Sequence, residues 1–215
     1  MLLTPRVMLF PDFLEHDKWN LVNEYCKNNG SSFPYIRDEE SPLCWVENTH
    51  SKDSNLKFIR SAYADEIEES KRKKHGEYYK NNVEYYIKDE CAREALTNVL
   101  DSIHSYIENI ENKKIIRESG PWITRIIEGG TMPFHCDGVF MTNRGSTSEY
   151  SIVYYINDDY EGGEFYMPRM GLKFKPIANS VLLFTNSEHE DMAHEVTPVT
   201  SGVRYVSQSW YASMV

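Results

Sequence analysis

The sequence predicts an α+β fold in which a mainly helical half precedes a β-rich half. Two observations predict it. From about residue 88 to 109, apolar residues recur at the three- and four-residue spacing of one buried helix face. From Trp122 onward the period shortens to that of strands, with Gly, Pro and Asn between short segments rich in Val, Ile, Tyr and Phe. We therefore expect the helical half to pack on a sheet built by the second half.

The β-rich half is divided into eight expected strands. So many short strands after a helical half predict a double-stranded β-helix, the jelly-roll architecture of the cupins, with two sheets facing each other. A chain of 215 residues suits one domain. We expect a single domain over 1–215, with 1–120 as a mainly helical supporting part and 121–215 as the β-helix core. The expected strands lie near 122–128, 132–137, 150–156, 163–168, 172–175, 180–184, 193–197 and 203–211.

The supporting part has fewer clear signals. Residues 6–10 read as a strand, and 14–27 read as a helix that Asn28, Asn29 and Gly30 end. Residues 31–53 predict irregular structure or a short pair of strands, and 55–83 are charged and predict mostly helix. The helix at 88–109 is the best defined, and we expect its apolar face, including Leu96, Val99, Leu100, Ile103 and Ile107, to brace the larger sheet.

Composition excludes several classes of function. The formal net charge of -10 disfavours a nucleic-acid partner, since such sites are marked by clustered Lys and Arg. No stretch approaches the roughly 18 apolar residues of a membrane span, and the start lacks the features of a secretory signal. Four scattered cysteines predict reduced thiols. We therefore expect a cytoplasmic protein. The four cysteines are Cys26, Cys44, Cys91 and Cys136.

Three residues of the β-rich half predict a metal site. In an extended strand His135 and Asp137 point to the same side, while Cys136 points away. Such a pair alone is more often a surface feature than a ligand pair, but His194 lies in a later predicted strand. Two imidazoles and one carboxylate can bind one face of Fe(II) and leave the other open. The pattern therefore favours an oxygenase-type iron site.

Arg204 begins the last predicted strand. Its same-face neighbours, Val206, Gln208 and Trp210, are uncharged, which predicts an inward-facing guanidinium rather than a surface ion pair. A buried arginine needs an anion, and its planar fork could bind a carboxylate through two parallel hydrogen bonds. We therefore expect Arg204 to anchor a dicarboxylate.

The run from Trp122 to Tyr211 resembles the 2-oxoglutarate- and Fe(II)-dependent dioxygenases, and within them the prolyl 4-hydroxylase type. The resemblance rests on several motifs in order. These are Gly129-Gly130, His135-x-Asp137, residues 152–157 (IVYYIN), residues 161–164 (EGGE), Pro176, residues 194–199 (HEVTPV), residues 202–205 (GVRY) and Trp210-Tyr211.

The resemblance implies roles for single residues. By it, His135, Asp137 and His194 would be catalytic iron ligands, while Arg204 and the hydroxyl of Tyr155 would bind the far carboxylate of 2-oxoglutarate. It also implies Fe(II), the co-substrate 2-oxoglutarate, O2 and, as a candidate reductant, ascorbate. The family often has tyrosines where this chain has Ile126 and Met132.

The expected reaction is hydroxylation of an unactivated C–H bond, with a prolyl residue of a peptide or protein as the substrate that the resemblance favours. Other substrates stay open: another side chain, a free small molecule or, less in keeping with the charge, methylated nucleic acid. A non-catalytic metal- or sugar-binding cupin is the alternative of another class. Residues 138–149 could cover the site as a mobile lid or serve as a plain connection.

Overall fold

The computed structural model describes residues 2–4, 6–30, 82–87, 89–117, 121–137, 148–186 and 192–213. The remaining residues lie outside these described ranges. Their sequence includes the predicted irregular segment at 31–53, most of the predicted helix at 55–83, and Cys44. The elements are β1 (Leu2–Thr4), β2 (Val7–Phe10), α1 (His16–Asn29), β3 (Asn82–Tyr86), α5 (Glu90–Glu111), β4 (Ile115–Arg117), β5 (Trp122–Ile127), β6 (Met132–His135), β7 (Tyr150–Tyr155), β8 (Glu161–Gly162), β9 (Phe165–Met167), η3 (Pro168–Met170), β10 (Leu172–Phe174), β11 (Ser180–Thr185), β12 (His194–Val196), β13 (Val199–Ser201) and β14 (Val203–Ser213).

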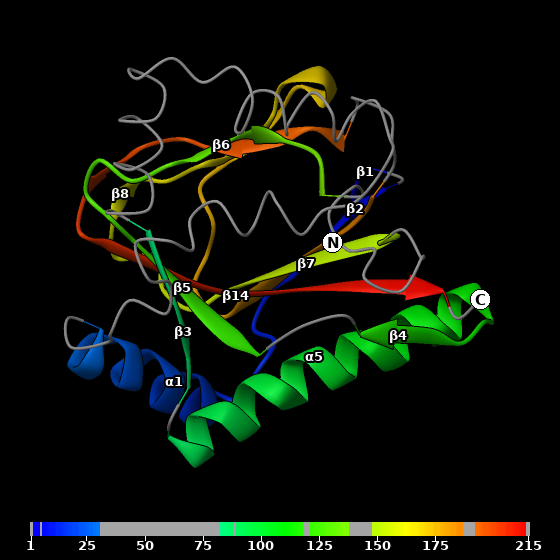
Figure 1. The fold of residues 1–215 in the computed structure, drawn as a ribbon, viewed down its shortest axis with the longest axis horizontal. Helices are drawn as coiled ribbons and strands as arrows, with labels where there is room; N and C mark the ends of the chain where they lie inside the picture. Colours follow the sequence, from blue (N-terminus) through cyan, green and yellow to red (C-terminus); the bar gives the residue numbers. More distant parts are fainter. Residues whose placement is uncertain are drawn as a thin grey trace, which may run out of the picture.

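The strands form a large sheet, a smaller sheet and a short two-stranded pair. The large sheet has eight strands in the order β1-β2-β11-β7-β14-β5-β3, with β4 paired to β14. The smaller sheet has four, in the order β10-β9-β12-β6, while β13 pairs with β8. Figure 1 shows the helices against one side of the large sheet and β6 on the other side. This arrangement confirms the predicted α+β jelly roll with a helical layer on its larger sheet.

The long strands of the large sheet separate two hydrophobic cores. Along β7, Ile152 and Tyr154 contribute to the core under the helices, whereas Tyr155 contributes to the core between the sheets. The same alternation places Leu183 of β11 in the first core and Phe184 in the second. Because successive strand residues point to opposite faces, two buried faces give the near-continuous burial of these strands.

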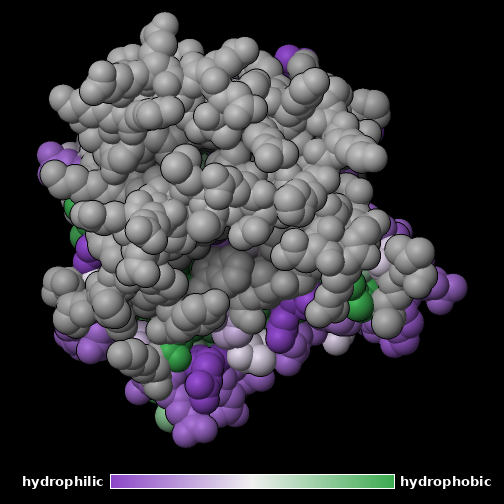
Figure 2. Space-filling view, in the orientation of Figure 1, coloured by the Kyte–Doolittle hydropathy of each residue, from purple (hydrophilic) through white to green (hydrophobic). Residues whose placement is uncertain are grey.

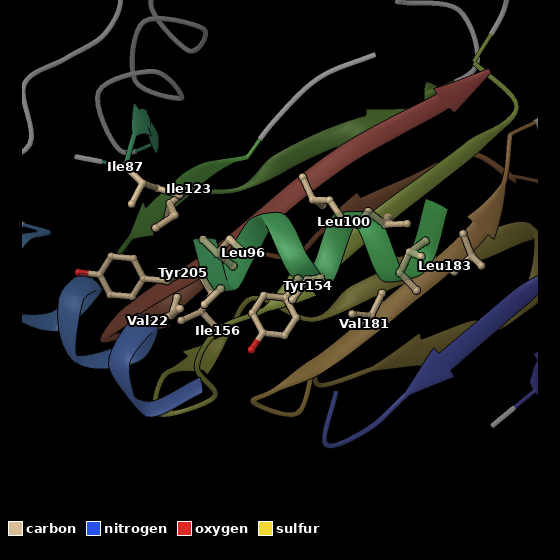
Figure 3. Packing of buried hydrophobic residues seen from close by; sticks show 14 of the residues in the cluster. Val22, Ile87, Leu96, Leu100, Ile123, Tyr154, Ile156, Val181, Leu183 and Tyr205 are labelled. Atoms are coloured by element: carbon tan, nitrogen blue, oxygen red, sulfur yellow. The ribbon is translucent and has the colours of Figure 1, made fainter. Parts of the chain in front are cut away.

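Helix α5 covers the large sheet as its periodicity predicts. It starts at Asp89, whose side chain accepts a hydrogen bond of 2.8 Å from the backbone N–H of Ala92. It ends at Asn112, which takes a left-handed conformation. Figure 3 shows Leu96 and Leu100 of α5 in one cluster with Ile123, Tyr154 and Tyr205 of the sheet. The buried face consists of Ala92, Ala95, Leu96, Val99, Leu100, Ile103 and Ile107.

Asn179 ties helix α1 to the sheet. Its carboxamide oxygen accepts a hydrogen bond from the backbone N–H of Leu14, and its amide donates to the carbonyl oxygen of Leu14. The Tyr154 hydroxyl donates to the same carboxamide oxygen. Asn179 has a φ of 56°, a conformation that asparagine tolerates better than most residues. The start of α1 is therefore held by a residue distant in sequence.

The supporting part contains more β-structure than the sequence predicted. Strands β1, β3 and β4 extend the large sheet, and Asn82 and Val83, which fall in the predicted 55–83 helix, begin β3. Strand β13, at residues 199–201, was also not predicted. Strands of three to five residues carry too little periodicity to be recognised, and pairing with distant strands decides their structure.

Among the described residues, neither helix is both long and apolar enough to cross a membrane. The surface that these residues contribute around the helices in Figure 2 is mainly hydrophilic. Three of the cysteines, Cys26, Cys91 and Cys136, are described, and they form no disulfide with one another.

Candidate metal and co-substrate site

Strands β6 and β12 bring two of the predicted metal ligands together. The antiparallel register pairs the Cα atoms of His135 and His194 directly. For His135 the structure describes the main chain, and the side chain lies outside the described part. Strand β6 ends at His135, so Asp137 lies beyond the strand rather than inside it as predicted. Asp137 nevertheless lies close to His194, and both side chains are buried.

The imidazole of His194 is held between aromatic rings and a backbone carbonyl. It stacks on Phe165 with ring centroids 5.1 Å apart and meets Phe184 edge-on at 5.0 Å. Its Nδ1 lies 3.1 Å from the carbonyl oxygen of Met192. Since a carbonyl oxygen only accepts hydrogen bonds, Nδ1 carries the proton in this contact. In the neutral ring, Nε2 then presents a lone pair, as a metal-ligating histidine requires.

The Nε2 atom of His194 faces the carboxylate of Asp137 across 3.8 Å. Ligand atoms lie about 2.0 to 2.2 Å from a divalent ion, so two ligands of one ion can be up to roughly 4.4 Å apart. The pair fits that limit, and nitrogen with oxygen donors suits Fe(II). The side chains described hold no group of three metal-binding residues, and His135 would be the third.

Arg204 faces the core between the sheets. It is 2% exposed, and its guanidinium carbon lies 5.4 Å from the ring centroid of Tyr155. Directly across the ladder is Ile126 of β5, one of the positions where the family often has tyrosine. The Nε atom of Arg204 is buried and has no hydrogen-bond partner in the described parts of the chain. The prediction of an inward-facing Arg204 is confirmed.

Aromatic rings connect the two parts of the site. His194 stacks on Phe165, the ring of Phe165 lies 5.7 Å from that of Phe174, and Phe174 meets Tyr155 at 6.5 Å. Tyr155 in turn lies under Arg204. The acid–imidazole pair and the guanidinium therefore border the same core, at opposite ends of a continuous apolar wall. A ligand with a metal-chelating end and an anionic end suits such a site.

Two hydroxyl groups of this region were not predicted from the sequence. Tyr160 is buried in the segment between β7 and β8, and Thr124 of β5 lies across from Val206, on the same sheet face as Arg204. Neither hydroxyl has a hydrogen-bond partner within the described ranges, and the same holds for Tyr155. Burial raises the pKa of Tyr155 and Tyr160, partly offset by the Arg204 charge. Both phenols therefore stay protonated at neutral pH.

A surface cleft lies outside this region. A volume of about 410 Å³ opens between the segment leading into α1 and the outer face of α5, with Leu14, Lys18, Asp101 and Ser102 among its lining residues. It borders the helical layer rather than the core between the sheets. Its mixed charges do not select one class of ligand. The buried position of His194 and Arg204 makes the core between the sheets the better candidate site.

Residues 121–212 match the family model described as the 2OG-Fe(II) oxygenase superfamily. This span covers every predicted site residue and the strands that carry them. This part of the chain is therefore similar to the 2OG-Fe(II) oxygenase superfamily. Within this segment, His135 ends β6, Asp137 follows β6, and His194 begins β12. Arg204 lies in β14 and Tyr155 in β7.

Curated relatives match only part of their own length. A PKHD-type hydroxylase of Pseudomonas fluorescens is 33% identical over 103 residues, which are 44% of each chain. A protein of Acanthamoeba polyphaga mimivirus, provisionally named a prolyl 4-hydroxylase, is 30% identical over 74 residues, 32% of this chain and 31% of that protein. This chain thus spans less than half of the length of these two relatives.

Solved structures share the fold over nearly the whole chain. A prolyl hydroxylase from Trichoplax adhaerens, solved with a hypoxia-inducible-factor peptide fragment, has a TM-score of 0.61 at 19% identity, covering 98% of this chain and 84% of the other. The viral collagen prolyl hydroxylase of Paramecium bursaria Chlorella virus-1, solved with 2-oxoglutarate, has a TM-score of 0.60 at 13% identity, covering 98% and 97%. At these identities the likeness establishes the fold. The predicted lid falls mostly outside the described residues, which resume at Ser148.

Proposed function

We propose that this protein is an Fe(II)- and 2-oxoglutarate-dependent dioxygenase that hydroxylates a prolyl residue in a peptide or protein. The proposal rests on the superfamily match of residues 121–212 and on the site within them. The observation that carries it is the placement of the His194–Asp137 pair and Arg204 along one aromatic wall. A metal-binding cupin that does no chemistry has no need of a buried arginine at the far end of such a wall.

The metal would be held by His135, Asp137 and His194. When bound, Fe(II) with 2-oxoglutarate and O2 supplies an oxidation in which one oxygen atom enters a substrate C–H bond and the other enters succinate, with loss of CO2. The chain's contribution is to orient its ligands. The Met192 carbonyl directs Nε2 of His194 toward the site, and Phe165 and Phe184 keep the imidazole from turning.

The co-substrate would be selected by Arg204. A buried, permanently charged guanidinium is costly unless an anion meets it, and a carboxylate can accept two parallel hydrogen bonds from its fork. The Tyr155 hydroxyl, buried and without a partner in the described structure, would donate a further hydrogen bond to the same carboxylate. Apolar rings between the two ends exclude water from the site.

The substrate class is supported by the relatives. The names of the two solved neighbours are those of prolyl hydroxylases, and one contains a peptide fragment. One fold serves many substrates, so this support is by analogy, and another side chain or a free small molecule is the alternative substrate. A cytoplasmic location is part of the proposal, since Cys26, Cys91 and Cys136 form no disulfide with one another.

The test is 2-oxoglutarate turnover by the Fe(II)-loaded protein, with ascorbate as reductant, against proline-containing peptides, free amino acids and methylated oligonucleotides. We expect succinate release coupled to a mass increase of one oxygen in a prolyl peptide, and loss of both on treatment with a chelator. Oxygen addition only to another substrate would correct the substrate class. Metal binding without any succinate release would favour the non-catalytic cupin.

A further inference from the structure

Tyr160 lies against Arg204 although it belongs to no strand of the large sheet. It is 3% exposed, and it approaches Arg204 at Gly163, which has a φ of 62°. A Cβ atom at Gly163 would lie 2.9 Å from Cε2 of Tyr160 and 3.1 Å from Cδ of Arg204. The first contact is closer than Cβ atoms normally come, and the second is tighter than most Cβ contacts. The glycine therefore permits the tyrosine ring and the arginine stem to share one site.

Three buried polar groups meet here, and none of them makes a hydrogen bond of good geometry in the described part of the chain, although both tyrosine hydroxyls lie close enough to Arg204 for its guanidinium to lower their pKa. They are Nε of Arg204 and the hydroxyls of Tyr155 and Tyr160. Leaving such buried groups unpaired is unfavourable, because each has lost its hydrogen bonds to water. Ile126, paired with Arg204 across the ladder, offers no hydrogen-bonding group. The arrangement is therefore incomplete until an acceptor enters.

The chemistry of these groups selects the acceptor. Arginine can only donate, and the two phenols can donate because burial raises their pKa and keeps them neutral. A carboxylate has two oxygens with about four lone-pair sites and no donor, so it can accept from all three residues at once. An amide or alcohol would leave part of the set unpaired.

We infer that Tyr160 is a specificity-determining residue for the co-substrate, donating a hydrogen bond to the carboxylate that Arg204 binds. This inference rests on the proposed function, because it assumes that the ligand is a 2-oxo acid with a distal carboxylate. Together, Arg204, Tyr155 and Tyr160 form a three-residue carboxylate pocket. Tyr160 acts on binding and not on the reacting atoms.

A purely structural role for Tyr160 makes a different prediction. Its ring also fits against Gly202, whose added Cβ would lie 3.1 Å from the Cβ of Tyr160, and the Lys175 ammonium lies 5.7 Å from the ring centroid. These contacts use the ring and the backbone, not the hydroxyl. Tyr160→Phe keeps them and removes only the oxygen. Since that oxygen is unpaired without ligand, the variant should be at least as stable as the wild type.

The experiment measures equilibrium binding of two acids to the Fe(II)-loaded protein without oxygen, by calorimetry. 2-Oxoglutarate carries the distal carboxylate, and 2-oxopentanoate has the same chain length without it. A hydrogen bond to a charged group corresponds to roughly a 10- to 100-fold change in affinity. Tyr160→Phe should weaken 2-oxoglutarate binding by about that factor and leave 2-oxopentanoate unchanged. Tyr205→Phe, which removes a hydroxyl on the helix side of the same sheet, should change neither.

The outcomes separate the inference from the proposed function. If Arg204→Lys weakens 2-oxoglutarate binding and Tyr160→Phe does not, the inference is wrong and the proposed function stands. Equal weakening of both acids by Tyr160→Phe also overturns it, because a distorted site rather than a lost hydrogen bond explains that result. If the wild-type protein does not prefer 2-oxoglutarate to 2-oxopentanoate, both the inference and the proposed co-substrate fail.

Discussion

The carboxamide of Asn157 hydrogen-bonds to the main chain on both sides of Arg204. Its Nδ2 donates to the carbonyl oxygen of Val203, and its Oδ1 accepts from the backbone N–H of Tyr205, each at 2.8 Å. Asn157 is 3% exposed and lies two residues after the end of β7. Its side chain thus takes over pairing where β7 has ended, and it fixes the stretch of β14 that carries the guanidinium.

Asn157→Ala should therefore impair co-substrate binding without touching the metal ligands. Leaving the buried Tyr205 N–H unpaired should lower the free energy of unfolding by about 1 to 3 kcal/mol. We expect the KM for 2-oxoglutarate to rise while Fe(II) affinity stays constant. An unchanged KM would limit Asn157 to a role in stability.

Asp137→Ala should abolish metal binding. Removing a group that hydrogen-bonds to a metal ligand already lowers metal affinity by roughly 10- to 100-fold, and removing a ligand itself should lower it more. Fe(II) affinity, measured directly, is the readout. The matched control is Glu195→Ala, which removes the carboxylate of the residue next to His194. The backbone of Glu195 pairs with that of Tyr166 in the ladder. Full activity of Asp137→Ala would end the assignment of this residue as a ligand.

Arg204→Lys keeps the charge but loses the planar fork. We expect the apparent affinity for 2-oxoglutarate to fall by roughly ten- to a hundredfold, because the charge-assisted bidentate contact is lost. Arg204→Ala should be worse, since the ligand carboxylate would be buried without a counter-charge. Fe(II) binding should survive in both variants. A 2-oxoglutarate dependence of turnover that is unchanged in Arg204→Ala would disprove the co-substrate assignment.

Leu100→Ala should destabilise the protein by about 2 to 5 kcal/mol, as large-to-small changes in a packed core do. Leu100 is 0% exposed and lies in the core between α5 and the large sheet. The measurement is the midpoint and slope of denaturant unfolding. Asn98→Ala, on the exposed side of the same helix, should shift the free energy by no more than about 0.5 kcal/mol. Equal midpoints for both variants would contradict the bracing role of α5.

Glu149 should make the end of the large sheet sensitive to acid. Burial acts to raise the pKa of its carboxyl, but hydrogen bonds from Lys113 and Ser213 outweigh burial and hold the pKa below the ordinary 4.5. Because the folded pKa is depressed, this contribution is present above about pH 4.5 and is lost as the pH falls through the folded value. Glu149→Gln should therefore destabilise the protein at neutral pH and progressively less in acid. A difference in unfolding midpoint that stays constant with pH would count against this.

Sequence periodicity was sufficient for elements whose partners do not need to be known. Helix α5 repeats its apolar face over 22 residues, so its burial follows from spacing alone. The inward orientation of Arg204 follows in the same way, because strand residues alternate and its same-face neighbours are uncharged. The motif order around His135, Asp137 and His194 also predicted the superfamily of this segment, although the exact end of β6 was two residues off.

Contacts between distant segments decided the rest. Nothing in the local sequence marks Tyr160 as a neighbour of Arg204, which lies 44 positions later in the chain. The positive φ of Gly163 and the pairing of β8 with β13 bring the two residues together. Asn157 and Asn179 are ordinary loop asparagines in the sequence, and only the completed sheet presents the backbone groups they bind. The sequence by itself determined periodic elements and a set of ligand types. The tertiary structure decided which buried polar groups face one another, because unpaired donors and acceptors are matched only after distant strands have paired.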